Sequence, residues 1–144
     1  MRHMIATNVL LAAVTGFCSA PSNAIVIVAN AKNPTQALSD NEVKNMYLGK
    51  LNQFPSGNRV VVIDHENGAT REAFLKSVLQ KTDVQYKAYW ARLAFTGSGT
   101  PPKQVTNDVA TLDQVERNPD AIGYVDDASI DLNGKNVKVL YQVK

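Results

Sequence analysis

The residues best placed for chemistry lie in one short stretch, residues 64–74, with the sequence DHENGATREAF. An apolar run precedes this stretch and a helical pattern follows it. The first N–H groups of a helix have no partners within the helix, and the helix dipole favours negative charge there. Gly68 and Ala69 leave room for a ligand. Thr70 adds a hydroxyl and Arg71 adds a positive charge, so these four residues are the candidate anion-binding residues.

The same turn has a simpler interpretation, because nearly every helix needs a cap. The side-chain oxygen of Asn67 or Thr70 would then accept a hydrogen bond from one of the free N–H groups. On the local pattern alone, capping is the commoner role for such residues. Anion binding and capping therefore both stay open at this point.

Catalytic chemistry finds little support elsewhere in the chain. After residue 24 the sequence has one histidine, His65, and no cysteine. The G-x-S-x-G nucleophile motif does not accompany that histidine, and Gly97-Ser98-Gly99 does not follow a strand pattern. Metal-ligand spacing is also missing, and adjacent Asp126 and Asp127 are interpreted as a solvated turn. We therefore predict a protein that is not an enzyme and holds no metal or cofactor.

Length and composition fit a single globular domain. The chain has 144 residues, of which 44% are hydrophobic and 19% are charged, and both fractions are ordinary. The formal net charge is +2. Such a small charge does not indicate a nucleic-acid partner, and we expect none.

The first 24 residues differ from the rest of the chain. A charged start precedes an apolar run at residues 9–17, and the small-residue site Ser22-Asn23-Ala24 follows. This is the layout of a secretory signal, and the apolar run is too short to span a bilayer comfortably. The alternative is a short buried N-terminal helix. We predict a signal peptide at residues 1–24 with cleavage after Ala24, export to the periplasm or beyond, and a mature chain without a membrane span.

Residues 25–144 alternate between strand and helix patterns, as a single domain. Capping boxes at Ser39–Glu42 and Thr82–Gln85 predict helix starts, and other helical patterns begin after the 64–74 turn and near Asn107. Strands separated by helices predict an α/β three-layer sandwich, in which helices flank a central, mainly parallel sheet. Short β-branched runs predict the strands, and these runs are residues 25–29, 60–63, 122–125 and 137–143.

Four aromatic residues cluster in the third helical pattern and just beyond it. These side chains could line an apolar pocket, but aromatic residues at helical spacing more often form a face toward the core. We therefore predict that they pack into the core. The four residues are Tyr86, Tyr89, Trp90 and Phe95.

Several segments together resemble the phosphate-binding proteins of ABC transporters. They are MYLGK at residues 46–50, VVVIDHENGATREAFLKSVL at 60–79, FTGSGTPPKQV at 95–105 and NPDAIGYVDD at 118–127. The resemblance implies one lobe of a type II periplasmic binding protein. It also implies phosphate or another small oxyanion as the ligand.

The chain departs from that family in two respects. The similarity covers one of the family's two lobes, and a single lobe cannot enclose a ligand as two closing lobes do. The family pattern at the phosphate turn is roughly R-x-D-x-S-G-T, and Thr70 alone is retained from it. Asp64 stands at the arginine position, so bidentate oxyanion recognition is lost and repulsion of phosphate is expected.

Two functions follow from this comparison. The first is a solute-binding-like protein with weak or altered anion binding. The second is a single-lobe interaction module that has lost high-affinity solute binding and docks to an envelope protein or associates with itself. The altered turn favours the second function, whereas Thr70 and the helix start keep the first open.

Overall fold

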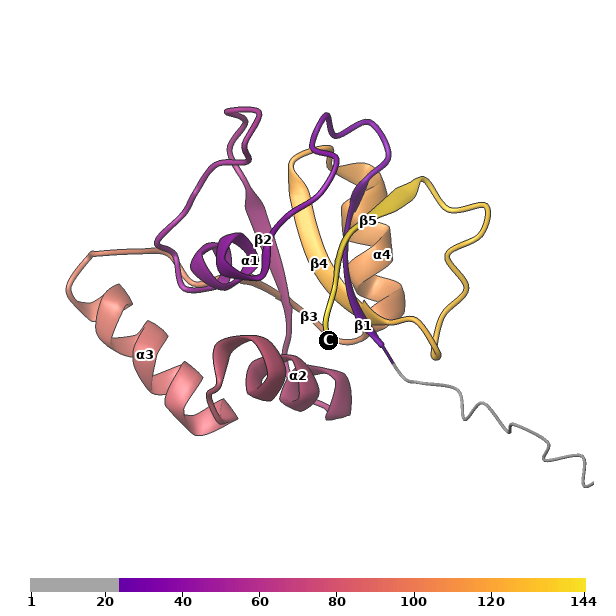
Figure 1. The fold of residues 1–144 in the computed structure, drawn as a ribbon. Coiled ribbons are helices and arrows are strands. Elements are labelled where there is room, and N and C mark those ends of the chain that lie inside the picture. The colour runs from indigo at the N-terminus through magenta and orange to yellow at the C-terminus, as the bar shows by residue number, and fades with distance from the viewer. Residues whose placement is uncertain (1–23) are drawn as a thin grey trace, which may run out of the picture.

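The computed structural model describes residues 24–144, and it shows a five-stranded sheet with helices packed on both faces (Figure 1). The predicted signal peptide, residues 1–24, lies outside the described residues apart from Ala24. Within residues 24–144, no helix has the length and apolar character needed to cross a membrane.

The sheet is mixed, but one strand alone runs against the others. Strand β2 pairs in parallel with β3 and β4, whereas β1 pairs antiparallel with β4 and β5. Because β1 opposes both of its neighbours, β5 points the same way as β4, and four of the five strands share a direction. The predicted sandwich with a mainly parallel sheet is therefore confirmed. The order is β3-β2-β4-β1-β5, with β1 at Ile25–Asn30, β2 at Val61–His65, β3 at Lys103–Val105, β4 at Ala121–Asp126 and β5 at Val137–Gln142.

Alternation along β1 divides the core into two layers. Ile25, Ile27 and Ala29 face the larger layer, beneath the helices on one side of the sheet. Val26 and Val28 face the smaller layer, beneath the last helix. Since successive side chains of a strand point to opposite faces, an apolar run of this kind suits a strand that is covered on both sides.

Two helices begin where the predicted capping boxes place them. Ser39 and Thr82 each accept a hydrogen bond in a complete capping box, with Glu42 and Gln85 as the reciprocal partners. The first helix buries Val43, Met46 and Tyr47, and the second segment buries Phe74, Leu75, Val78 and Leu79. The segments are α1 at Asp40–Tyr47, α2 at Ala69–Phe74 continuing as a π-helix, η1, at Leu75–Leu79, α3 at Asp83–Phe95 and α4 at Asp108–Arg117.

Helix α3 is attached to the body by a few aromatic contacts. The hydroxyls of Tyr86 and Tyr89 donate to the carbonyls of Tyr47 and Leu48, at 2.7 and 2.6 Å. The Trp90 ring lies so close to Gly49 that a Cβ there would come within 2.6 Å of it. These contacts fix α3 against the end of α1.

Two details differ from the sequence-based predictions. Strand β3 was not predicted, because it has three residues of which two are exposed, and such a short segment has no alternating pattern. Phe95 was predicted in the core with the other aromatic residues of α3. That prediction is wrong for Phe95, which is 94% exposed, and it is confirmed for Tyr86 and Trp90, which are buried.

Candidate functional site

A pocket of about 340 Å³ lies where β2 and β3 end. Its walls are the turn after β2, residues 65–70, and the start of α4, residues 106–109, with Ser129 at the rim. Parallel neighbouring strands end at the same edge of a sheet, and ligands of α/β proteins bind at that edge. The topology thus brings together two helix starts that are about forty residues apart in the chain.

Helix α2 begins in this pocket without a side-chain cap. Its N-cap is Gly68, which has φ 105°, and no side chain there accepts a bond from the first turn. Each of the other α-helices within residues 24–144 has a side-chain cap, provided by Ser39, Thr82 or Asn107. The capping interpretation of Asn67 and Thr70 is therefore wrong, and the first N–H groups of α2 remain available to a ligand.

Asp64 and Arg71 form an ion pair inside the core. Their exposed fractions are 2% and 1%, and Arg71 Nη1 contacts Asp64 Oδ2. Arg71 also donates to the carbonyl of His65 at 2.7 Å and to Asp83 Oδ1 at 2.9 Å. The hydroxyl of Tyr124 donates to the other oxygen of Asp64 at 2.6 Å. Asp64 is thus neutralised within the core and does not line the pocket, so the repulsion expected of it is not directed at a ligand there.

Neighbouring carboxylates stabilise the positive charge of Arg71. Burial of the guanidinium acts to lower its pKa, but the attraction and hydrogen bonds of Asp64, with the hydrogen bond of Asp83, outweigh this effect and raise the pKa. A buried charge is costly unless it is paired. The contacts of Arg71, a residue of α2, therefore hold α2 against the end of β2 and the start of α3.

A histidine and a carboxylate line the pocket wall. His65 Nε2 lies 3.0 Å from the Thr111 hydroxyl and 3.4 Å from Asp108 Oδ1, and its ring stacks on Tyr124 at 4.5 Å. Burial lowers the pKa of His65 more than nearby Asp108 raises it. Burial also raises the pKa of Asp108, whose other oxygen accepts a bond from the Asp126 amide at 3.2 Å.

The predicted site residues separate into two groups. Gly68, Ala69 and Thr70 line the pocket, whereas Arg71 does not and faces Asp64 instead. Asp108 was not predicted as a pocket residue. The signal that could have found it is positional, because a residue in the first turn of the helix after β3 must lie beside the turn after β2.

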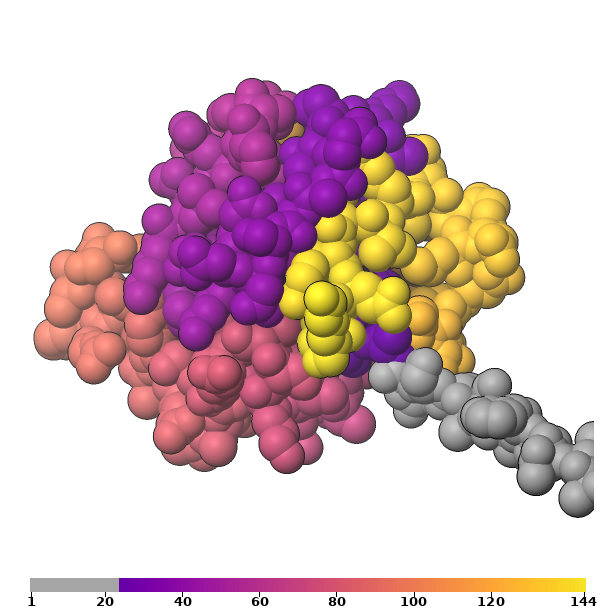
Figure 2. Space-filling view, in the orientation of Figure 1, coloured from indigo at the N-terminus to yellow at the C-terminus, as the bar shows by residue number. Residues whose placement is uncertain are grey.

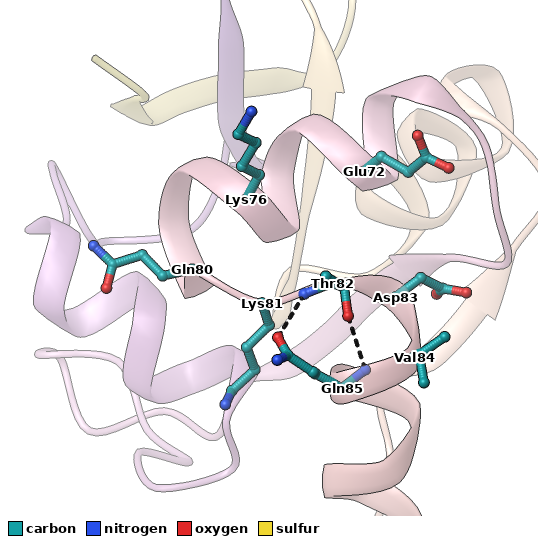
Figure 3. Close-up of a pocket in the computed structure, with 8 residues that line it drawn as sticks. All are labelled: Glu72, Lys76, Gln80, Lys81, Thr82, Asp83, Val84 and Gln85. Carbon is teal, nitrogen blue, oxygen red and sulfur yellow. Dashed lines mark hydrogen bonds between the residues drawn. The ribbon is translucent and has the colours of Figure 1, made fainter.

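A larger groove of about 640 Å³ lies between the end of η1 and the start of α3 (Figure 3). Thr82 and Gln85 bond to each other's backbone there. Lys76, Gln80 and Lys81 point in different directions and do not converge on a common point (Figure 3). The groove therefore offers less to a small ligand than the pocket beside α2. Within residues 24–144, no group of three or more His, Cys, Asp and Glu side chains is placed to hold a metal ion.

Comparison with protein families gives a clear result. A family model described as the PBP superfamily domain matches residues 20–141, which is most of the chain. This chain therefore belongs to the family described as the PBP superfamily domain. A comparison with curated proteins finds no match.

The fold of this PBP-family domain is that of one part of larger solved structures. A protein from Clostridium perfringens, assigned as a phosphate ABC transporter substrate-binding protein and solved with bound phosphate, matches with a TM-score of 0.63 at 20% identity. An ABC-type phosphate transport receptor from Vibrio cholerae has a TM-score of 0.62 at 18% identity, and PstS from Borrelia burgdorferi has 0.62 at 11%.

In each case the match covers 82% of this chain and 44 to 46% of the other chain. The chain therefore spans less than half the length of these structures. The prediction that it corresponds to a single lobe is confirmed.

Proposed function

We propose that this domain is exported and binds a small oxyanion with low affinity, in the pocket beside the start of α2. Phosphate is the first candidate, because the similar solved structures are named as phosphate-binding proteins. The observation that carries the proposal is the start of α2 without a side-chain cap, which borders a pocket shared with the start of α4. Two helix starts that face one cavity both favour a negative charge.

Each residue of the turn has its own role in this proposal. Gly68 and Ala69 allow a ligand to approach the backbone, and Thr70 offers a hydroxyl. Arg71 does not touch the anion. It holds the turn in place through the His65 carbonyl and Asp64.

Two features account for the low affinity. The pocket contains the Asp108 carboxylate but no lysine or arginine side chain among its described lining residues. The pocket is also open to water, which weakens the electrostatic contacts of any ligand there. We expect dissociation constants in about the millimolar range, which corresponds to about 4 kcal/mol of binding free energy.

Export and the absence of catalysis complete the proposal. Residues 1–24 have the charge and hydropathy pattern of a signal peptide. The hydroxyl that contacts His65 is that of Thr111, at 3.0 Å, and Thr111 is fully buried, so this hydroxyl is not placed to attack a substrate. The similar solved structures are named as binding or transport proteins. The proposed location is therefore the periplasm or the exterior of the cell.

Equilibrium dialysis of the purified chain against labelled phosphate tests the proposal. We expect saturable binding, which Asp108→Asn strengthens because it removes a negative charge from the pocket. Thr70→Ala should weaken binding, whereas Thr96→Ala, at an exposed threonine outside the pocket, should not. The absence of saturable binding at millimolar phosphate would overturn the proposal.

A second function, that of an interaction module, is favoured by one observation. Helix α3 exposes large apolar side chains that nothing in residues 24–144 covers. The two functions use different surfaces, because the pocket and α3 have no residue in common.

A further inference from the structure

Helix α3 carries an exposed apolar stripe along its outer side. Val84 is 76% exposed and Phe95 is 94% exposed, and Ala88 and Ala91 between them are exposed as well. The spacing of four, three and four residues places all four side chains on one side of the helix. The end of α3 and the loop after it project from the side of the molecule (Figures 1 and 2).

A groove of about 250 Å³ runs beside this stripe. Ala91 and Ala94 of α3 form one wall, and Pro101 and Pro102 form the other. Trp90 also lines the groove, as do Asp64 and Arg71, and all three side chains are largely buried. The apolar surface of the stripe therefore continues into a cavity with apolar walls of alanine and proline and a charged pair at its inner side, large enough for a long aliphatic side chain.

The charges beside the stripe are positive. On a helix, Lys87 and Arg92 lie on opposite flanks of the line from Val84 to Phe95. The acid on α3, Asp83, already pairs with Arg71 at 2.9 Å and with Lys87 at 2.8 Å. Arg92 has no ion pair within the described residues, although it lies over the Tyr89 ring.

We propose that this surface, the α3 stripe with its groove, binds an amphipathic helix of another protein that carries acidic residues beside its apolar face. A helix laid along α3 can approach closely over the two alanines and place one long apolar side chain in the groove. Its acids would then face Lys87 and Arg92. A second copy of this chain would place cations against cations, and a flat bilayer would not fill the groove.

The test uses two synthetic helical peptides of about 20 residues, long enough to cover α3. Both have a leucine face, but one has glutamates along its flanks and the other has lysines at the same positions. Fluorescence anisotropy measures the binding of each labelled peptide to the full chain. We expect the acidic peptide to bind at least about tenfold more tightly, because like charges at an interface are strongly unfavourable.

Variants of the chain locate the binding surface. Phe95→Ser should weaken binding of the acidic peptide by about tenfold or more, as expected for the largest apolar side chain of the stripe. Val139→Ser, at another exposed apolar residue on β5, is the matched control and should have no effect. Arg92→Glu should weaken binding severalfold, whereas Arg59→Glu, the same charge change at an exposed site away from α3, should not.

Several outcomes would overturn this inference. Equal binding of the two peptides would show that charge does not select the partner. Binding to vesicles of anionic lipid but to neither peptide would assign the surface to a membrane. A dimer that Phe95→Ser abolishes would assign it to a second copy. Failure to bind the acidic peptide would refute it directly. Because the phosphate test concerns other residues, either proposal can fail without the other.

Discussion

The starts of α2 and α3 show opposite arrangements of polar and apolar groups. At α2 the charged side chains Asp64 and Arg71 turn into the core, and backbone N–H groups are left at a pocket. At α3 a capping box of Thr82 and Gln85 binds two backbone N–H groups, and apolar side chains are left at the surface. The first arrangement suits a small anion, and the second suits an apolar partner. The free N–H groups or exposed apolar side chains at a helix start thus indicate which kind of ligand can bind there.

The largest expected effect concerns the ion pair behind α2. Arg71→Ala leaves Asp64 buried without a cation, and it should lower the free energy of unfolding by about 3 to 5 kcal/mol. Urea unfolding measures the change. Arg117→Ala, which removes an exposed pair with Asp113, is the control and should cost about 0.5 kcal/mol or less. Similar losses for the two variants would show that Asp64 is not charged and buried as described.

The next effect is a pH dependence that arises at the pocket wall. Because burial lowers the pKa of His65, the unfolded chain binds this proton more readily than the folded chain. The stability is therefore full above the unfolded pKa, about 6.5, and falls as the pH drops below it. The slope for one proton is at most about 1.4 kcal/mol per pH unit.

Unfolding curves between about pH 5 and pH 7 measure this slope. His65→Gln should remove it in that window. Asp108, whose pKa is raised, acts in the opposite sense, because its contribution to stability is lost as the pH rises above its usual pKa near 4. An unchanged slope in the His65 variant would exclude His65 as its source.

A smaller effect compares the two helix starts directly. Thr82→Ala removes both the cap and half of a capping box, and it should cost about 1 kcal/mol. Thr70→Ala, in the second position of an α2 that has no side-chain cap, should change stability by less than about 0.5 kcal/mol. Thermal unfolding of the two variants measures both values. A larger cost at Thr70 would show that it caps α2 in solution.

The smallest effect is expected at the exposed end of α3. Phe95→Ser should leave the free energy of unfolding within about 0.5 kcal/mol of the parent, because a side chain this exposed contributes little to the core. Phe74→Ala, at a fully buried phenylalanine, should cost about 3 to 5 kcal/mol. Urea unfolding measures both variants. A substantial cost at Phe95 would mean that it is covered in solution, as in a self-associated form.

Most of the local structure could be predicted because its signals are local. The capping boxes at Ser39 and Thr82, the buried run at residues 25–29 and the helix start near Asn107 all depend on neighbouring residues. Of the residues predicted to bind an anion, Gly68, Ala69 and Thr70 line a pocket, and anion binding there stays a prediction. Asp108 joined that pocket through the pairing of β2 with β3, and a three-residue strand has no periodic signal.

Sequence alone determined the class of fold and the starts of α1, α3 and α4. Those features follow from residue type and short-range spacing. Tertiary structure alone decided that Asp64 and Arg71 neutralise each other, that α2 has no side-chain cap, and that Phe95 lies outside the core. The direction of a side chain depends on which elements pack around it, and that packing involves residues distant in the chain.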